Sequence, residues 1–136
     1  MQPDEVLRDA QEWMEHAAMD LQAATILLSG STVLPEIAVF HAQQAAEKAL
    51  KGFLIFRGHP FSRTHDLAQL VSSCESIEPD FSRFASAAKV LTPYAVRSRY
   101  PGYSPAPSLP ESEEAARLAA EIVQFVRDRL PSPPNS

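Results

Sequence analysis

Polar side chains of four residues gather along one edge of an otherwise apolar predicted helix: His41, Gln44, Lys48 and Lys51. At about 100° per residue, Lys48 falls near ~340° when His41 is set to zero. On the same scale Gln44 falls near ~300° and Lys51 near ~280°. Glu47 borders this arc near ~240°. A helix this apolar belongs in the centre of a fold, so its polar edge either faces solvent or lines a cleft.

Two further groups of polar residues follow along the chain. His65 and Asp66 stand at the start of a predicted helix, where free backbone amides can bind an anion and Asp66 can orient a neighbouring cation or His65. Arg99 suits phosphate through its fork of N–H donors, and Tyr100 can stack on a base. If all three groups converge in space, they form a cleft with basic walls that suits a nucleotide or an RNA phosphate.

Each group also has a purely structural interpretation. The two lysines can be solvated, with Glu47 as a local ion-pair partner. His65 and Asp66 can cap the helix that they precede. Arg99 and Tyr100 can hydrogen-bond the last carbonyl groups of the helix before them. Periodicity alone leaves these alternatives open.

Helices must position these side chains, because no stretch alternates with a period of two as a strand would. We predict a first helix from Pro3 to about Leu28 and a second from Pro35 to about residue 56 or 57. A third starts at an N-cap at Thr64, and a fourth starts near Pro79 and is kinked or ended by a later proline. The last helix starts at a capping box over residues 108–111 and reaches about residue 130. The expected fold is an all-α, up-and-down bundle of four to five helices.

Bulk composition narrows the classes of function. The chain has 136 residues, 45% of them hydrophobic and 21% charged, so we expect one helical domain over residues 1–130 and a disordered tail over 131–136. A net charge of −5 argues against broad, nonspecific binding of nucleic acid. No signal peptide or membrane span is recognisable, which favours a cytoplasmic protein. No phosphate loop, zinc pattern or nucleophile elbow occurs, and we expect neither a metal nor a cofactor.

Several short motifs together resemble the HEPN family of small helical domains. They appear in the family's order: Trp13 with Asp20-Leu21, the stretch 41–51, Thr64-His65-Asp66-Leu67, and Arg99-Tyr100-Pro101. The resemblance covers about residues 5 to 128. It implies a helical bundle that forms a symmetric homodimer. It also implies a minimal nucleotidyltransferase as a partner in a toxin–antitoxin or nucleotide-handling module.

Many HEPN proteins are metal-independent RNases that use an Arg followed, after four to six residues, by a His. This chain departs from that pattern, because its last histidine is His65 and no arginine precedes a histidine at that spacing. The leading hypothesis is therefore a non-catalytic HEPN subunit that binds a nucleotide or RNA phosphate. The alternative is a metal-independent RNase with a different residue set, in which His65 acts as base or acid. A third interpretation is a helical dimer whose polar edge is only an interface.

Overall fold

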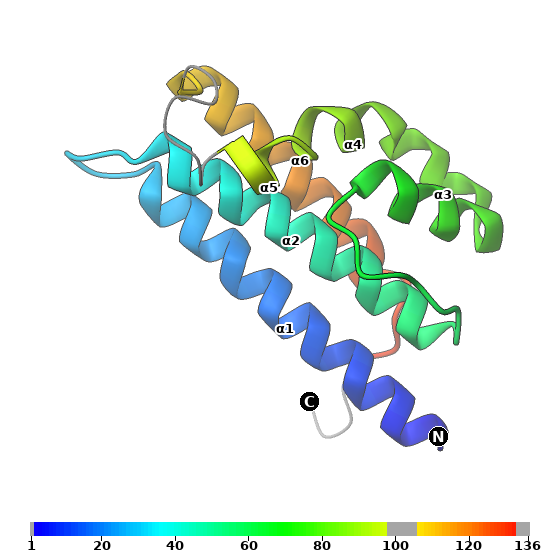
Figure 1. Cartoon of the computed structure of the whole chain (residues 1–136). Helices are drawn as coiled ribbons and strands as arrows, with labels where there is room; N and C mark the ends of the chain where they lie inside the picture. Colours follow the sequence, from blue (N-terminus) through cyan, green and yellow to red (C-terminus); the bar gives the residue numbers. More distant parts are fainter. Residues whose placement is uncertain (1, 98–105, 133–136) are drawn as a thin grey trace.

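The protein is all-α throughout the residues that the computed structural model describes, 2–97 and 106–132. Figure 1 shows two long helices side by side, a third long helix against them, and a group of shorter helices on the other side of α2. The elements in chain order are α1 (Pro3–Leu27), α2 (Pro35–Phe56), α3 (Leu67–Ile77), a 3₁₀ segment η1 (Pro79–Phe84), α4 (Ala85–Leu91), α5 (Tyr94–Arg97) and α6 (Leu109–Arg127). The predicted fold class is thus confirmed, with more and shorter helices than expected.

The first two helices form an antiparallel hairpin whose predicted bounds are confirmed to within a residue. Both helices begin on a proline, which needs no N–H partner in the first turn. The turn between them uses Gly30 at φ 84°, a conformation that other residues adopt only with strain. A hydrogen bond from the Leu34 amide to the Leu27 carbonyl closes the connection. Residues far apart in the chain thereby face each other along the two helices.

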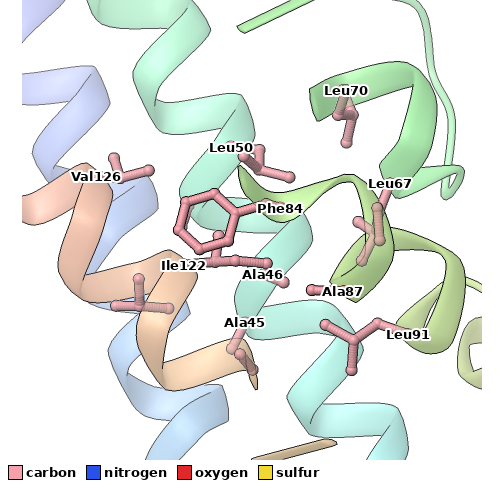
Figure 2. Close-up of a cluster of buried hydrophobic side chains, with 14 of the residues drawn as sticks. Ala45, Ala46, Leu50, Leu67, Leu70, Phe84, Ala87, Leu91, Ile122 and Val126 are labelled. Atoms are coloured by element: carbon pink, nitrogen blue, oxygen red, sulfur yellow. The ribbon is translucent and has the colours of Figure 1, made fainter. Parts of the chain in front are cut away.

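Helix α2 is the central element, and small side chains let its neighbours approach it closely. Ala42, Ala45, Ala46 and Ala49 are fully buried. At Gly52 an added Cβ would lie 3.2 Å from the Cβ of Trp13 and 3.3 Å from the Ala10 carbonyl oxygen, so a side chain there would require α1 to move by a few tenths of an ångström. Figure 2 shows the core on the other side of α2, with labelled side chains from α2, α3, α4 and α6 around Phe84.

The third helix starts two residues later than predicted. Asp66, rather than Thr64, is the N-cap, because its carboxylate accepts hydrogen bonds from the Ala68 and Gln69 amides. The Thr64 hydroxyl instead accepts from the Asp66 amide at 3.0 Å. Both residue types suit a cap, and the helix begins at Leu67, which is buried in the core directly after Asp66.

The predicted fourth helix is divided into η1, α4 and α5. The first part packs Phe81 and Phe84 into the core as a tight 3₁₀ segment before the α-helix begins. Pro93 separates α4 from α5, because proline has no N–H for the helical hydrogen bond and its ring clashes with the turn before it. The predicted kink or end at this proline is confirmed.

The last helix begins as its sequence predicts. Ser108 and Glu111 form a reciprocal capping box. The Ser108 hydroxyl accepts a hydrogen bond from the Glu111 amide, and the Glu111 carboxylate accepts one from the Ser108 amide. The expected disordered tail falls mostly on residues 133–136, which lie outside the described residues. Within the described ranges, no helix is both long and apolar enough to cross a bilayer.

Candidate functional site

The polar edge of α2 divides into two separate groups of side chains. His41 and Lys48 turn toward α1 and meet Asp20, and we call these three residues the Asp20 cluster. The rest turn toward the segment before α3 and surround one carboxylate. We call this second group the Glu47 cluster, and it comprises Gln43, Gln44, Glu47, Lys51 and His65. One helix therefore presents two polar sites, next to each other along its polar edge.

In the Asp20 cluster a single carboxylate holds an imidazole and an ammonium group. Asp20 Oδ1 lies 2.8 Å from His41 Nδ1, and Oδ2 lies 2.6 Å from Lys48 Nζ. An ionised carboxylate only accepts hydrogen bonds, so His41 carries its proton on Nδ1 and leaves Nε2 outside the pair. Lys48 Nζ has three donors, and two remain after the bond to Asp20. The side chains of His41 and Lys48 are 30% and 27% exposed, so these groups are within reach of a ligand.

A surface groove of about 410 Å³ lies beside Lys48, between α1 and α2. Its other lining residues come from α1: Asp9, Glu12, Trp13 and His16. Asp20 lies one helical turn beyond His16 on the same face of α1. The groove thus combines an aromatic side chain, two carboxylates, an imidazole and an ammonium group. It is not uniformly basic.

In the Glu47 cluster both oxygens of a buried carboxylate are occupied. Lys51 Nζ lies 2.9 Å from Oε2, and His65 Nδ1 lies 2.9 Å from Oε1. Gln43 also donates to Oε1, at 3.1 Å, and to the His65 carbonyl oxygen at the same distance. The Glu47 side chain is 5% exposed, whereas that of His65 is 63% exposed. The cluster therefore fixes one nitrogen of His65 and leaves the rest of the ring in solvent.

Glu47 is held in its ionised form by these partners. Burial by itself would raise the pKa of Glu47 by disfavouring its charge. The hydrogen bonds from His65, Lys51 and Gln43 outweigh burial, together with the charge of Lys51, and lower the pKa below its ordinary value of 4.5. At neutral pH the buried carboxylate is therefore a negative charge matched by buried Lys51.

Aromatic side chains complete the surroundings of Lys51. Its ammonium group lies 5.9 Å from the ring centre of Trp13 and 5.6 Å from that of Phe61. The two rings meet edge to face at 6.3 Å. Lys51 thereby links α1, α2 and the segment before α3, which is a structural role. Of the two lysines, only Lys48 lines the groove.

The structure places the sequence-predicted residues as follows. Lys51, Gln44 and His65 do meet, at Glu47, and His41 meets Lys48 at Asp20. Asp66 caps α3, while the ion pairs of the two lysines are with Asp20 and Glu47. Arg99 and Tyr100 lie outside the described residues. The hypothesis of one basic cleft formed by all three groups thus stays a prediction, while each lysine already has a carboxylate partner.

Sequence reasoning gave no site role to three residues on which these clusters depend. Asp20 and Glu47 each join two basic side chains, and Gln43 is fully buried beside Glu47. A carboxylate on α1 that faces α2 has no signal in the periodicity of α2. For Glu47 the sequence does carry a signal, because it stands four residues before Lys51, which is the favourable order for an ion pair on a helix. Within the described ranges, no three His, Cys, Asp or Glu side chains are grouped to hold a metal ion.

A family model and a solved structure both connect this chain with HEPN proteins. The sequence model of the HEPN domain family matches residues 10–129 of this chain. The fold is similar to that of TT1696 from Thermus thermophilus, with 35% sequence identity, a TM-score of 0.74, and coverage of 89% of this chain and 98% of the other. It is also similar to ST0689, described as an archaeal HEPN homologue, with 27% identity, a TM-score of 0.72, and coverage of 90% and 98%. No curated protein sequence matches this chain.

Proposed function

This chain belongs to the HEPN family, and we propose that it is the non-catalytic subunit of a two-component module with a minimal nucleotidyltransferase. In this role it forms a homodimer and binds a nucleotide or an RNA phosphate at the Asp20 cluster. No arginine in this chain is followed by a histidine at the spacing that the family's RNases use, which supports a subunit that does not cut RNA. The observation that carries the binding role is the lysine ammonium group and the imidazole held on one carboxylate, beside an open groove.

The Asp20 cluster is preorganised for an anion in spite of its carboxylate. Asp20 fixes the direction of both His41 and Lys48, so little side-chain entropy is lost when a phosphate arrives. The ammonium group retains two N–H donors for phosphate oxygens, and Nε2 of the imidazole, as an acceptor, can take a hydrogen bond from a ribose hydroxyl. Trp13 lines the same groove and offers a flat surface on which a base can stack. A nucleotide can therefore meet donors and an aromatic ring in one place.

Calorimetric titration with AMP, ATP and a short single-stranded RNA tests the binding role. Lys48→Gln removes the charge that faces the groove and should weaken binding about tenfold, as expected for a charge-assisted phosphate contact. Lys89→Gln is the matched control, because Lys89 is an exposed lysine on α4, away from the groove. Equal affinity of both variants and the wild type would exclude Lys48 from the phosphate site.

Co-purification tests the module. The proposal requires that a minimal nucleotidyltransferase is encoded in a neighbouring gene and forms a complex with this protein that survives size-exclusion chromatography. A mixture that elutes as two separate proteins, over a range of salt concentrations, would contradict the pairing.

The Glu47 cluster favours one alternative, a metal-independent RNase with His65 as acid or base. The buried carboxylate fixes His65 Nδ1 at 2.9 Å, and the exposed ring leaves Nε2 facing solvent, which is the usual arrangement of an oriented catalytic imidazole. Lys51 has little part in phosphate binding under this alternative, because its ammonium group is bound to Glu47 and covered by aromatic rings.

Incubation of purified protein with RNA in the presence of a chelator separates the two functions. We expect intact RNA for both the wild type and His65→Ala. RNA degradation by the wild type that is abolished in His65→Ala would establish the RNase and refute the non-catalytic subunit. His59→Ala is the control for the loss of an imidazole elsewhere.

A further inference from the structure

Helix α1 carries the whole charge imbalance of the protein. It contains six acidic residues and one basic residue, Arg8, whereas the rest of the chain contains eleven of each sign. In the part of the chain that the structure describes, five of the six carboxylates take part in no ion pair: Asp4, Glu5, Asp9, Glu12 and Glu15. The negative field of the molecule is therefore concentrated on one helix.

The same helix exposes two large apolar side chains. Met19 is 60% exposed and Ile26 is 62% exposed, the highest values for large apolar residues in the described ranges. They are seven residues apart, so Ile26 falls near ~340° when Met19 is set to zero. Buried Ala17 and Met14 fall near ~160° and ~220°, on the opposite side. The two apolar residues thus point directly away from the core of this protein.

Two acidic residues precede Met19 on the outer face of α1, by about one and two helical turns. Glu12 falls near ~20° and Glu15 near ~320° relative to Met19, and both are exposed. Contacts with α2 and α6 cover only the inner side of α1. An unpartnered helix face with apolar residues seven apart and a row of like charges is typical of a helix that receives another helix.

We propose that the outer face of α1 is the docking surface for a basic amphipathic helix of a partner protein. Apolar residues of the partner cover Met19 and Ile26, and its Lys or Arg residues face Glu12 and Glu15. The inference rests on the proposed function, in which this chain pairs with a second protein, and it names the surface and the charge of that partner.

Charge decides between this occupant and a second copy of the chain. Two copies joined through this face would bring two acidic helices together within a Debye length of about 8 Å at physiological salt. Such like-charge contact weakens association, whereas a basic partner is both attracted and oriented by the same field.

Two synthetic peptides of about 18 residues, roughly five helical turns, serve as probes. Both carry Leu residues seven apart, one with Lys and the other with Glu on the flanks. Fluorescence anisotropy should show binding of the Lys peptide that weakens as salt rises, and none of the Glu peptide. Met19→Ser/Ile26→Ser should weaken binding about tenfold, whereas Val90→Ser, which changes an exposed residue on α4, should not.

Charge-reversed variants with the same total charge test the location of the surface. Glu12→Lys/Glu15→Lys and Glu75→Lys/Glu113→Lys each add four charges to the net −5, so both have a net charge of −1. Only the first should abolish binding of the Lys peptide. Equal binding by the two variants, or no binding by the wild type, would overturn the docking surface. A change in the self-association of Met19→Ser/Ile26→Ser by sedimentation would assign the face to a second copy instead.

The docking surface and the proposed function can fail separately. If a minimal nucleotidyltransferase from a neighbouring gene binds the wild type and Glu12→Lys/Glu15→Lys equally well, the pairing is supported and the docking surface is refuted. If it does not bind the wild type, the pairing is refuted, and the peptide experiment alone decides the docking surface.

Discussion

Glu47 is a buried charge whose neighbours are all arranged to keep it ionised. Four side chains donate to its two oxygens, and the permanently charged partner, Lys51, is itself only 10% exposed. A pair of this kind contributes little compared with an apolar pair, because both charges lose their hydration. Removal of one member is costly, because the other charge then stays buried without compensation.

Glu47→Gln tests the cost of leaving Lys51 buried without its negative partner. We expect the free energy of unfolding in urea to fall by about 3 kcal/mol, the typical cost of leaving a buried charge unpaired. Glu114→Gln is the control, since Glu114 is exposed and pairs with Arg117 on the same helix, and its unfolding midpoint should hardly change. A variant at position 47 as stable as the wild type would mean that Lys51 finds another partner or reaches water.

The lowered pKa of Glu47 also predicts a pH dependence of stability. The unfolded chain takes up a proton on this carboxyl group near its ordinary pKa of 4.5, whereas the folded protein does so only at lower pH. The stabilisation is therefore complete above pH 4.5 and is lost as pH falls from there through the lower folded pKa. Urea midpoints of the wild type and Glu47→Gln should converge over that range. A constant difference down to the acid limit would contradict the prediction.

At the scale of elements, the sequence predicts helices well where local chemistry marks their ends. The prolines at the starts of α1 and α2 and the capping box of α6 act through hydrogen bonds within one turn, so they can be read without tertiary structure. The start of α3 could not be read this way, because Thr64 and Asp66 are both good caps. Asp20 could not be predicted as the partner of Lys48, because their pairing depends on how two helices are aligned.

The sequence predicts Asp66 as a ligand residue, and substitutions at this position separate that role from capping. Asp66→Ala removes the acceptor for two amides of α3 and should cost about 1 kcal/mol of unfolding free energy. Asp66→Asn keeps an oxygen acceptor and should be nearly as stable as the wild type. If Asp66→Asn retains stability but loses affinity for a nucleotide, the carboxylate also serves the ligand. If the two variants are equally unstable, the charge rather than the cap is what matters.

The contact between α1 and α2 is tight at Gly52, where an added methyl group would lie 3.2 to 3.4 Å from atoms of α1. Gly52→Ala adds helix propensity worth up to about 1 kcal/mol, but its Cβ meets the Ala10 carbonyl and the Trp13 Cβ, which cannot move without the helix. Overpacking costs typically ~1–3 kcal/mol, so we expect a net loss of about 1 kcal/mol in thermal or urea unfolding. Gly52→Val should be worse. A stabilised Gly52→Ala would show that α1 can shift outward at little cost.

On the scale of the whole molecule, α2 joins two polar clusters that share no residue. One contacts α1 and the groove, and the other contacts the segment before α3. In the described part of the chain, the side-chain hydrogen bonds of each cluster stay within it, although Glu47 and Lys48 are adjacent in sequence. Whether they act as one site or two is a question of coupling free energy.

A double-mutant cycle with Asp20→Asn and Glu47→Gln measures this coupling. Sites without shared partners usually add to within about 0.5 kcal/mol, so the double variant should lose the sum of the two single losses in unfolding free energy. The same cycle on AMP binding should show an effect of Asp20→Asn alone, because only that cluster borders the groove. Coupling above about 1 kcal/mol in binding would mean that both clusters contact one ligand. The single cleft predicted from the sequence, with Lys48 and His65 as two of its walls, would then replace the two separate clusters.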